Sequence, residues 1–561
     1  MLRPALSSGR SRRSALNRSK RSGAVVACLL ILGLTPSLAQ AGTPSITSMW
    51  PRKGPVGRGV FIKGAGFANA TDVEFNGKPA TFAIRSDNRI RAVVPSGATA
   101  GPVTITAEGS TASSPQPFVV QPNIVLILTD DQRFDELDHM PIVQSQLIDK
   151  GTKFSNGYVV NPLCCPSRTT ILTGKYSHGT DVYSNIPPHG GFQTFVTTNH
   201  EDRSTIATWL QKAGYDTGIV GKYLNGYTAG KTAYVSPGWN TWDVLANPGA
   251  DGGYFNETMS LNGVSKAYGS APADYSTDVL SGYASDFIES APPDQPLFLY
   301  FAPKAAHPPA TPPPRYADSL TDIAPLRPPS YNEADVSDKP AYIQAVPPGG
   351  SWAQGQDNLR LHQYQSLLAV DDAVGNIVNA LSASGRLQDT LIVFASDNGL
   401  SLGEHRWTNK KAPYEEDIRV PVIARYDALL HQTASVDNRF VLNLDFAPTF
   451  AAAGGTTAPN AEGVSILPLL DGSATSWRSD FLVEHADTRA VTVPTYCAVH
   501  DEQYMYVDYS TGEEELYDLS ADPYELQNQA SNPDAPYPDV KAAMHARLLQ
   551  LCSPPPPGFA P

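Results

Sequence analysis

The chain has 561 residues, of which 41% are apolar and 17% charged, and its 41 basic and 55 acidic side chains give a formal net charge of −14. This apolar fraction excludes a mainly disordered chain, and the length allows a large core and more than one domain. The acidity argues against a nucleic-acid partner, because proteins that bind nucleic acid present a basic face to its backbone.

The first 41 residues have the layout of a secretory signal peptide. Seven basic residues and no acidic one lie within the first 22, an apolar run follows over 24–34, and Ala39-Gln40-Ala41 is a small-x-small cleavage site. The apolar run is too short to cross a bilayer comfortably, and no later run approaches that length. We therefore expect cleavage near Ala41 and secretion without a stable membrane span. The alternative is an uncleaved membrane anchor.

Residues 43–120 carry the pattern of a small antiparallel β-sandwich. Short runs rich in Val, Ile and Phe, among them 59–63 and 89–94, alternate in polarity between Gly, Pro and Asn turns. The turn glycines and core positions, such as those of Ile62-Lys63-Gly64-Ala65-Gly66-Phe67, resemble the immunoglobulin-like IPT/TIG domain. Such a match specifies a fold and not a function. With eight basic and four acidic residues, the segment is consistent with a glycan- or surface-binding role and with a passive spacer.

Two apolar runs in the remainder of the chain each end in adjacent oxygen-bearing side chains. Residues 123–129 lead into Asp130-Asp131, and residues 390–396 lead into Asp397-Asn398. Such runs suit strands buried on both faces of an α/β sheet, where functional groups gather at the carboxyl ends of strands. Carboxylates packed together repel, so the pattern predicts a hard-cation site. The alternative is that these residues cap helices or form turns.

A third acidic pair, Asp371-Asp372, serves as an internal comparison. Apolar residues at helical spacing over 364–381 place it within a helix and not at a strand end. We interpret this pair as structural or solvated.

Between the two strand ends lies Cys164-Cys165-Pro166-Ser167-Arg168, followed by Leu172-Thr173-Gly174. This pattern resembles the signature of the sulfatase family, in which the first cysteine of Cys-x-Pro-Ser-Arg is oxidised to formylglycine. The matching residue is Cys164, and the resemblance implies that Cys165 is ordinary packing. The alternative is a pair of buried, inert cysteines before a helix that starts at Pro166.

The resemblance also implies a complete active site. The residues it assigns to a bound cation are Asp130, Asp131, Cys164, Asp397 and Asn398, with Ca²⁺ favoured over Mg²⁺; an all-oxygen Asp/Asn set also disfavours zinc. The residues it assigns to catalysis are Cys164, Arg168, Lys222, His307 and Lys410, of which Lys222, His307 and Lys410 would contact the sulfate ester. Lys411 is the alternative to Lys410 if the loop aligns one residue off. Asn225 and His405 are further substrate-binding candidates.

The chemistry of a sulfate monoester fits these residues. A hydrated aldehyde at residue 164 offers two hydroxyl groups: one attacks sulfur, and the other lets sulfate leave by elimination, which a plain serine or cysteine cannot do. A bound cation lowers the pKa of such a hydroxyl and polarises the sulfate oxygens. His307 or Lys410 would protonate the leaving alcohol.

Two segments resemble the N-acetylglucosamine-6-sulfatase branch of the family: Lys222-Tyr223-Leu224-Asn225 and the C-terminal run 514–526. Many arylsulfatases carry histidine two residues after the lysine, where this chain has Leu224. Asn225 is therefore the candidate for the missing polar contact. The proline-rich residues 308–350 follow His307 and are expected to form a pocket rim.

We therefore predict four segments: a signal peptide over 1–41, an all-β immunoglobulin-like (IPT/TIG) domain over 43–120, an α/β catalytic domain over 121–475 and a small α+β subdomain over 476–555. The catalytic domain should contain a large mixed central sheet sandwiched by helices, as in the alkaline-phosphatase-like superfamily. Cys497 and Cys552 are candidates for one disulfide.

The predicted activity is hydrolysis of sulfate monoesters on a sulfated carbohydrate or an aryl sulfate. A formylglycine-generating enzyme would be the partner that oxidises Cys164. The alternatives are a phosphonate or phosphate monoester hydrolase of the same superfamily and a catalytically inactive exported glycan-binding protein.

Overall fold

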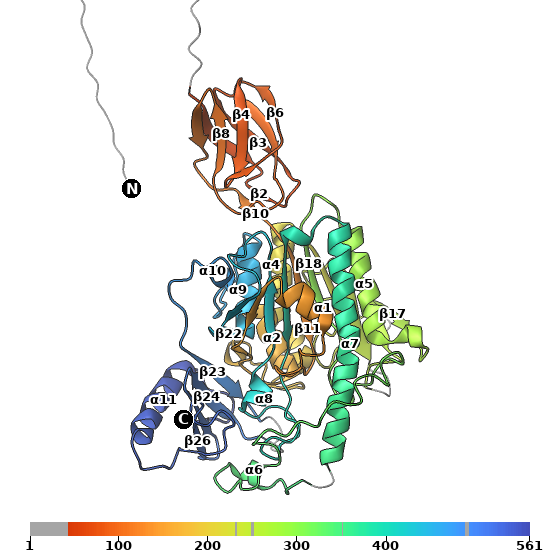
Figure 1. The fold of residues 1–561 in the computed structure, drawn as a ribbon, viewed down its shortest axis with the longest axis vertical. Coiled ribbons are helices and arrows are strands. Elements are labelled where there is room, and N and C mark those ends of the chain that lie inside the picture. The colour runs from red at the N-terminus through yellow and green to blue at the C-terminus, as the bar shows by residue number, and fades with distance from the viewer. Residues whose placement is uncertain (1–42, 230–232, 248–251, 350–351, 488–492, 561) are drawn as a thin grey trace, which may run out of the picture. The chain divides into compact units, whose positions relative to one another are not determined.

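The computed structural model describes residues 43–229, 233–247, 252–349, 352–487 and 493–560 (Figure 1). The predicted signal peptide lies outside these ranges. Among the described residues, no helix combines the length and the apolar character needed to cross a membrane.

The first folded segment is a β-sandwich of two antiparallel sheets. One sheet has the order β1(Ser45–Trp50), β3(Gly59–Ala65), β7(Arg89–Val93), β6(Phe82–Ser86), and the other has the order β5(Lys78–Pro79), β4(Ala70–Phe75), β8(Val103–Ala107), β9(Ser110–Ser113). A short parallel pair, β2(Lys53–Gly54) with β10(Val119–Val120), accompanies them. The inward side chains of both sheets, including Val60, Ile90 and Ile105, form one apolar core. The predicted all-β immunoglobulin-like segment is confirmed.

The second folded segment contains a mixed sheet of ten strands. Its order is β17(Val264–Ala267), β16(Thr258–Leu261), β15(Thr241–Asn247), β14(Asp216–Gly221), β18(Leu297–Ala302), β11(Asn123–Thr129), β19(Thr390–Ser396), β20(Val422–Arg425), β12(Thr152–Phe154), β21(Ser435–Asp437). Five adjacent strands, β15, β14, β18, β11 and β19, run parallel. A separate short pair joins β13(Gly157–Tyr158) to β22(Val441–Leu442).

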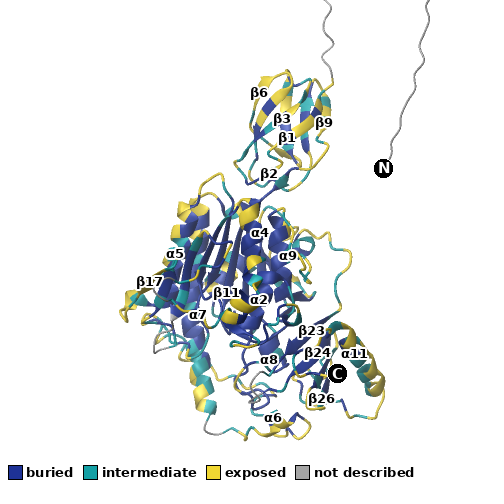
Figure 2. Ribbon diagram, turned by 180° about the vertical axis from the view of Figure 1, so that it is seen from behind, coloured by how far each residue is buried: buried dark blue, intermediate teal, exposed yellow. Residues whose placement is uncertain are grey.

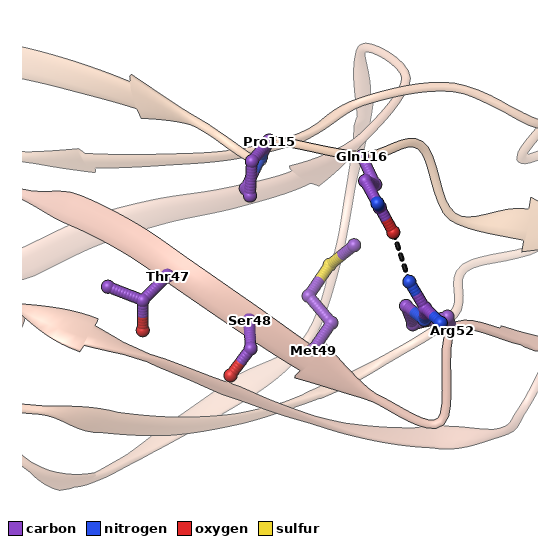
Figure 3. Close-up of a pocket in the computed structure, with 6 residues that line it drawn as sticks. All are labelled: Thr47, Ser48, Met49, Arg52, Pro115 and Gln116. Atoms are coloured by element: carbon purple, nitrogen blue, oxygen red, sulfur yellow. Dashed lines mark hydrogen bonds between the residues drawn. The ribbon is translucent and has the colours of Figure 1, made fainter. Parts of the chain in front are cut away.

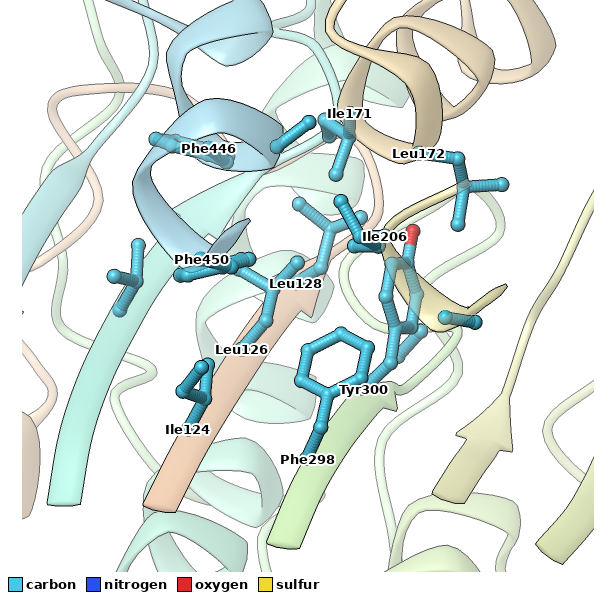
Figure 4. Close-up of a cluster of buried hydrophobic side chains, with 14 of the residues drawn as sticks. Ile124, Leu126, Leu128, Ile171, Leu172, Ile206, Phe298, Tyr300, Phe446 and Phe450 are labelled. Carbon is cyan, nitrogen blue, oxygen red and sulfur yellow. The ribbon is translucent and has the colours of Figure 1, made fainter. Parts of the chain in front are cut away.

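Helices cover both faces of this sheet, which explains why its central strands are apolar throughout. On one face, α2(Cys164–Thr173), α4(Ile206–Ala213) and α9(Phe446–Ala453) pack on Ile124, Leu126 and Leu128 (Figure 4). On the other face, α5(Ser276–Ser290) and α7(Ala353–Ala383) pack on Val125 and Ile127. Alternate residues of β11 therefore enter two different cores, and both are buried (Figure 2). The predicted α/β class is confirmed.

The remaining α-helices of the described chain are short, apart from the last: α1(Pro141–Val143), α3(Gly191–Gln193), α6(Ala341–Gln344), α8(Glu415–Ile418), α10(Leu467–Leu470) and α11(Tyr537–Leu551). The Asp371 carboxylate on α7 accepts hydrogen bonds from the backbone N–H groups of Ile142 (2.9 Å) and Val143 (2.7 Å), and so it satisfies the amino end of α1. Asp372 pairs with Arg315 at 2.9 Å. The structural interpretation of this acidic pair agrees with both contacts.

The third folded segment is an antiparallel sheet with the order β23(Asp480–His485), β24(Tyr496–Asp501), β25(Tyr504–Tyr509), β26(Glu514–Asp518). Met544 and Leu548 of α11 pack with Leu482, Tyr506 and Leu516 of this sheet. A disulfide between Cys497 on β24 and Cys552, directly after α11, ties the helix to the sheet. This is the small α+β subdomain that the sequence predicts.

Gly221, the last residue of β14, pairs with Ala302, the last residue of β18. Its φ is +116°, and a Cβ on it would lie 2.0 Å from the carbonyl oxygen of Ala302 on β18. The next residue, Lys222, donates its backbone N–H to that same oxygen at 2.7 Å. Only glycine satisfies both the backbone conformation and the spacing.

Replacing Gly221 tests this constraint. Gly221→Ala should lower the free energy of unfolding by about 2–5 kcal/mol, because it adds left-handed strain and a clash with a backbone atom. Gly282→Ala is the matched control: Gly282 lies on α5 with nothing within 4 Å of its Cβ position. That change should stabilise the helix by about 0.5–1 kcal/mol. Thermal unfolding measures both, and equal midpoints for the two variants would contradict the assignment.

Candidate active site

The carboxyl ends of four adjacent parallel strands surround the candidate site. Asp130 and Asp131 follow β11, and Asp397 and Asn398 follow β19, whose last residue, Ser396, pairs with Thr129. Lys222 follows β14, and the loop that carries His307 follows β18. Because the strands are in register, side chains from segments hundreds of residues apart emerge together.

Helix α2 brings Cys164 and Arg168 to these strand ends. Cys164 is its first residue, and Pro166 fits the first turn, where a backbone N–H has no partner within the helix. Arg168 lies four residues later and therefore on the same face of the helix. Every residue of α2 is buried, including Arg168, so its polar side chains must find partners inside the protein.

Cys164 is the centre of a hydrogen-bonded cluster. Its Sγ lies 2.9 Å from Nζ of Lys410, 3.7 Å from Oδ1 of Asp130 and 3.9 Å from Oδ1 of Asp131. Burial raises the pKa of the thiol, and this effect outweighs the opposite influence of Lys222 and Lys410. The neighbouring Cys165 donates its backbone N–H to Asn185 and lies in the apolar core, as the family resemblance implies.

Three carboxylates lie beside Cys164 almost without access to solvent. Asp130, Asp131 and Asp397 are 0–1% exposed, and one oxygen of each lies within 4.8 Å of the others. Asn398 donates its Nδ2 to Asp131 at 2.7 Å, which leaves its buried Oδ1 with no hydrogen-bond partner in the described structure. Three carboxylates and one unpartnered amide oxygen form a donor set that fits a hard divalent cation.

Each of these carboxylates is also paired with a basic side chain. Lys222 lies 2.5 Å from Asp130, Lys410 lies 2.5 Å from Asp131, and Arg168 lies 2.7 Å from Asp397. Without these partners, three carboxylates at this depth could not all stay ionised.

The two strand ends differ in how strongly their carboxylates are held ionised. Burial alone would raise the pKa of Asp130, but Lys222, His307 and Arg168 together lower it well below its usual value. For Asp397, burial and the neighbouring Asp130 outweigh Arg168 and raise the pKa to about 6. The negative charge of Asp397 is therefore offset least by its basic neighbours. An additional cation placed beside Asp397 would stabilise the cluster most.

His307 borders the same cluster from the β18 side. Its Nε2 lies 3.8 Å from Asp131. Its Nδ1 donates to the carbonyl of Pro308 at 2.6 Å, because a carbonyl can only accept. Burial lowers the pKa of this histidine to about 4, so the ring is neutral at pH 7 and Nε2 carries the lone pair. Tyr254 donates its hydroxyl to the His307 carbonyl at 2.7 Å and holds this loop.

The structure thus brings together nine of the predicted residues: Asp130, Asp131, Cys164, Arg168, Lys222, His307, Asp397, Asn398 and Lys410. Lys410, and not its neighbour Lys411, reaches the cluster. Asn225 is half-buried, and its Oδ1 has no hydrogen-bond partner among the described residues. His405 is fully buried, with Nδ1 2.7 Å from Glu333 and its ring against Tyr414, and no hydrogen bond between described residues joins it to the cluster.

Lys304 is a basic residue at this site that the motifs do not identify. Burial and the nearby Lys222 ammonium lower its pKa, while Asp130, Cys164 and Asp131 act in the opposite direction. Among the described residues it forms no salt bridge. It lies two residues after the end of β18, so inspection of charged residues beyond each buried strand would have pointed to it.

Comparisons with known proteins agree with this arrangement. The sulfatase family model matches residues 122–456, the model for the C-terminal part of N-sulphoglucosamine sulphohydrolase matches 403–553, and the IPT/TIG domain model matches 44–120. The N-acetylglucosamine-6-sulfatase of Capra hircus is 33% identical over 483 residues, which cover 78% of this chain and 84% of the relative.

Two solved structures share the fold. One, a protein in complex with its substrate D-glucosamine-2-N,6-O-disulfate, has a TM-score of 0.66 at 23% identity, covering 77% of this chain and 98% of its own. The other, a phosphonate monoester hydrolase of Agrobacterium radiobacter, has a TM-score of 0.62 at 21% identity, covering 77% and 96%. The family model spans more than half of the chain, and the site lies within it. The chain therefore belongs to the sulfatase family of sulfuric ester hydrolases.

Proposed function

We propose that this chain hydrolyses sulfate monoesters on a sulfated sugar, with formylglycine formed from Cys164 as the nucleophile and a divalent cation bound beside it. The observation that carries the proposal is the position of Cys164, which lies among Asp130, Asp131 and Lys410 at the carboxyl edge of the parallel strands. A cysteine kept as a thiol in these surroundings would have a raised pKa and would be a poor nucleophile. The polar and charged side chains around residue 164 suit the hydroxyl groups of a hydrated formylglycine better than they suit a thiol.

The proposed cation ligands are Asp130, Asp131, Asp397 and Asn398, together with residue 164. Ca²⁺ suits this oxygen-only set, and Mg²⁺ suits it less, because Mg²⁺ usually keeps several waters. The cation supplies Lewis acidity to the sulfate oxygens and to the nucleophile. Lys222 and Lys410 pair with Asp130 and Asp131 here, and both would be able to bind sulfate oxygens if a cation took over the charge of those carboxylates.

The other side chains have distinct proposed roles. The planar guanidinium of Arg168 donates hydrogen bonds to Asp397 and to the Lys222 carbonyl. These bonds fix helix α2 at this point and so orient residue 164, which lies one helical turn before Arg168. The proton for the leaving alcohol comes from His307 or Lys410. Burial keeps His307 neutral, and its one ring proton, on Nδ1, is bonded to the Pro308 carbonyl, so its Nε2 has no proton to give. The Lys410 ammonium carries protons and lies 2.9 Å from Sγ of residue 164, which favours Lys410 as the donor.

The proposed substrate class is a sulfated sugar, with an aryl sulfate as the simpler analogue. The 33% identity to an N-acetylglucosamine-6-sulfatase and the fold shared with a protein that binds a disulfated glucosamine support it. Asn225, with its unpartnered Oδ1, is the proposed sugar contact. The substrate-binding role of His405 stays a prediction, since its described hydrogen bond goes to Glu333.

We also propose that the chain is exported. The layout of residues 1–41 supports this, and so does the disulfide between Cys497 and Cys552, because disulfides persist in oxidising compartments. A formylglycine-generating enzyme would then oxidise Cys164 before or during export.

The reaction class separates this proposal from its nearest rival, a phosphonate or phosphate monoester hydrolase, whose fold is shared. The matured chain should hydrolyse 4-nitrophenyl sulfate and glucosamine 6-sulfate faster than 4-nitrophenyl phosphate or a matching phenylphosphonate. Side-by-side kcat/KM values at one pH provide the measurement. A preference for the phosphorus esters would favour the rival, and no turnover of any ester by matured material would favour an inactive glycan-binding protein.

The two adjacent cysteines form a matched pair for the nucleophile. Cys164→Ala should lower sulfate release by about 10⁴-fold or more, since it removes the attacking group. Cys165→Ala should retain activity and cost about 1–2 kcal/mol of stability through a small core cavity. The mass of the peptide that contains Cys164 provides an independent readout, because a formylglycine residue and a cysteine residue differ in mass. An unmodified thiol in fully active protein would refute the mechanism.

The two adjacent lysines form a second matched pair. Lys410→Ala should lower kcat by about 10²- to 10³-fold, because it removes a cation within 2.9 Å of Sγ of residue 164. Lys411→Ala should leave kcat within about tenfold, because Lys410, and not Lys411, forms the described hydrogen bonds to Cys164 and Asp131. Steady-state kinetics of both variants on one sulfate ester decide the matter. If Lys411→Ala lowered kcat more than Lys410→Ala does, the catalytic lysine would be Lys411 and not Lys410.

A further inference from the structure

The solvent-facing side of the sheet β1-β3-β7-β6 in the IPT/TIG domain carries an unusual set of side chains. On β3 and β7, alternate residues point inward and are buried: Val60, Ile62, Ile90 and Ala92. The residues between them are half-buried or exposed and point outward. We use the term outer face for five residues on this side: Trp50, Phe61, Lys63, Arg89 and Arg91.

The strand register arranges these five residues in two rows. Trp50 pairs with Phe61, and Phe61 pairs with Arg91, so two aromatic rings and a guanidinium form one row across three strands. Lys63 pairs with Arg89, which places two cations opposite each other in the next row. The Arg89 guanidinium also lies 5.7 Å from the centre of the Phe61 ring. The outer face is thus one continuous aromatic and basic surface.

This arrangement does not serve the stability of the sandwich. Trp50 is 70% exposed, although burial of an indole ring is strongly favourable. Like charges directly opposite each other on neighbouring strands destabilise a sheet. Among the described residues, no acidic side chain forms a salt bridge with Lys63, Arg89 or Arg91. The charge of the outer face is therefore available to an external anion.

A hollow of about 320 Å³ lies along the edge strand β1, next to Trp50 in the chain (Figure 3). Its lining residues are Thr47, Ser48, Met49, Arg52, Pro115 and Gln116. The Arg52 guanidinium bonds the Gln116 side chain and so stays at the edge of the hollow. The hollow is thus lined by two hydroxyl residues of the strand that carries the exposed indole and by a further cation, Arg52.

The chemistry of these side chains identifies one class of ligand. A flat exposed indole packs against the apolar face of a sugar ring, and guanidinium and ammonium groups bind sulfate oxygens. The charge of the chain supports the same ligand: residues 43–120 have eight basic and four acidic side chains, whereas residues 121–561 have 26 basic and 51 acidic ones. A polyanion would therefore be attracted to the IPT/TIG domain and repelled by most of the remaining surface.

We propose that the outer face of the IPT/TIG domain binds sulfated polysaccharide chains and keeps the enzyme on a polymer that bears its substrate groups. The choice of a sulfated ligand rests on the proposed function. The inference that this aromatic and basic surface binds an anion does not depend on that function. The active site then meets sulfate esters at a raised effective concentration, although it lies on an acidic body.

The experiment compares single changes in the full-length chain carrying Cys164→Ala, so that no turnover occurs during binding. The probe is heparin, immobilised for salt elution and free in solution for titration. Trp50→Ala and Arg91→Ser should each weaken heparin binding by about tenfold, the loss of one good contact. Arg91→Ser should also reduce the slope of log K against log salt by about one, because one cation is lost, whereas Trp50→Ala should leave that slope unchanged.

Lys78→Ser is the matched control. Lys78 is exposed on β5 of the other sheet, and its replacement removes the same charge as Arg91→Ser. It should change heparin affinity by less than about twofold, as a charge away from the contact surface does. Equal effects of Lys78→Ser and Arg91→Ser would overturn the proposal. So would equal affinity for chemically desulfated heparin, or equal affinity for a DNA duplex at the same salt concentration.

A second readout separates this inference from the proposed function. With Cys164 intact, Trp50→Ala and Arg91→Ser should keep the wild-type kcat/KM on 4-nitrophenyl sulfate and lose rate only on a sulfated polysaccharide. Heparin binding through the outer face without hydrolysis of any sulfate ester would refute the proposed function and support the surface. Hydrolysis of sulfate esters with heparin binding unchanged in both variants would refute the surface alone.

Discussion

The pairing of three buried carboxylates with three buried cations is the interaction on which this site depends. Asp130, Asp131 and Asp397 would repel one another strongly at this depth if each did not face a basic group. Their partners come from the residue directly after β14, from a late loop and from helix α2, so no local segment can assemble the site. The in-register ends of the parallel strands, and the glycine that lets β14 approach β18, make the pairing possible.

The same pairing explains how a site for a cation and an anion can exist on an acidic body. The local charge of the cluster is close to neutral before any ligand arrives, because each carboxylate has its own cation. A divalent cation would shift this balance toward positive charge within a few ångströms of Cys164, and a sulfate group would restore it. Attraction of substrate is therefore local, since the field of the distant surface is screened beyond about 10 Å. The basic outer face of the IPT/TIG domain would act by direct binding, holding a sulfated polymer close enough for its sulfate groups to reach the active site.

Much of the fold and most of the site can be predicted because the relevant signals are local in the chain. Continuous apolar runs indicate strands buried on both faces, and the residues directly after them must emerge at one edge of the sheet. Asp371 shows why position matters more than residue type: it belongs to an acidic pair like Asp130-Asp131, yet it lies on a helix and satisfies backbone N–H groups of α1. The disulfide and the contact of His405 with Glu333 depend on distances between remote segments, which no local pattern encodes.

The sequence by itself determined the three folded segments, the family and the order of the site residues, because periodicity and motif spacing are properties of short stretches. The tertiary structure alone decided that Lys410 and not Lys411 reaches Cys164, because the loop conformation sets which of two adjacent side chains points inward. It also decided that Lys304 joins the site and that Trp50 lies in register with Phe61 and Arg91, beyond an irregularity in β1 between Ile46 and Ser48. Register and loop conformation follow from packing between distant segments, and in β1 a shift of one residue would send Trp50 to the opposite face of the sheet.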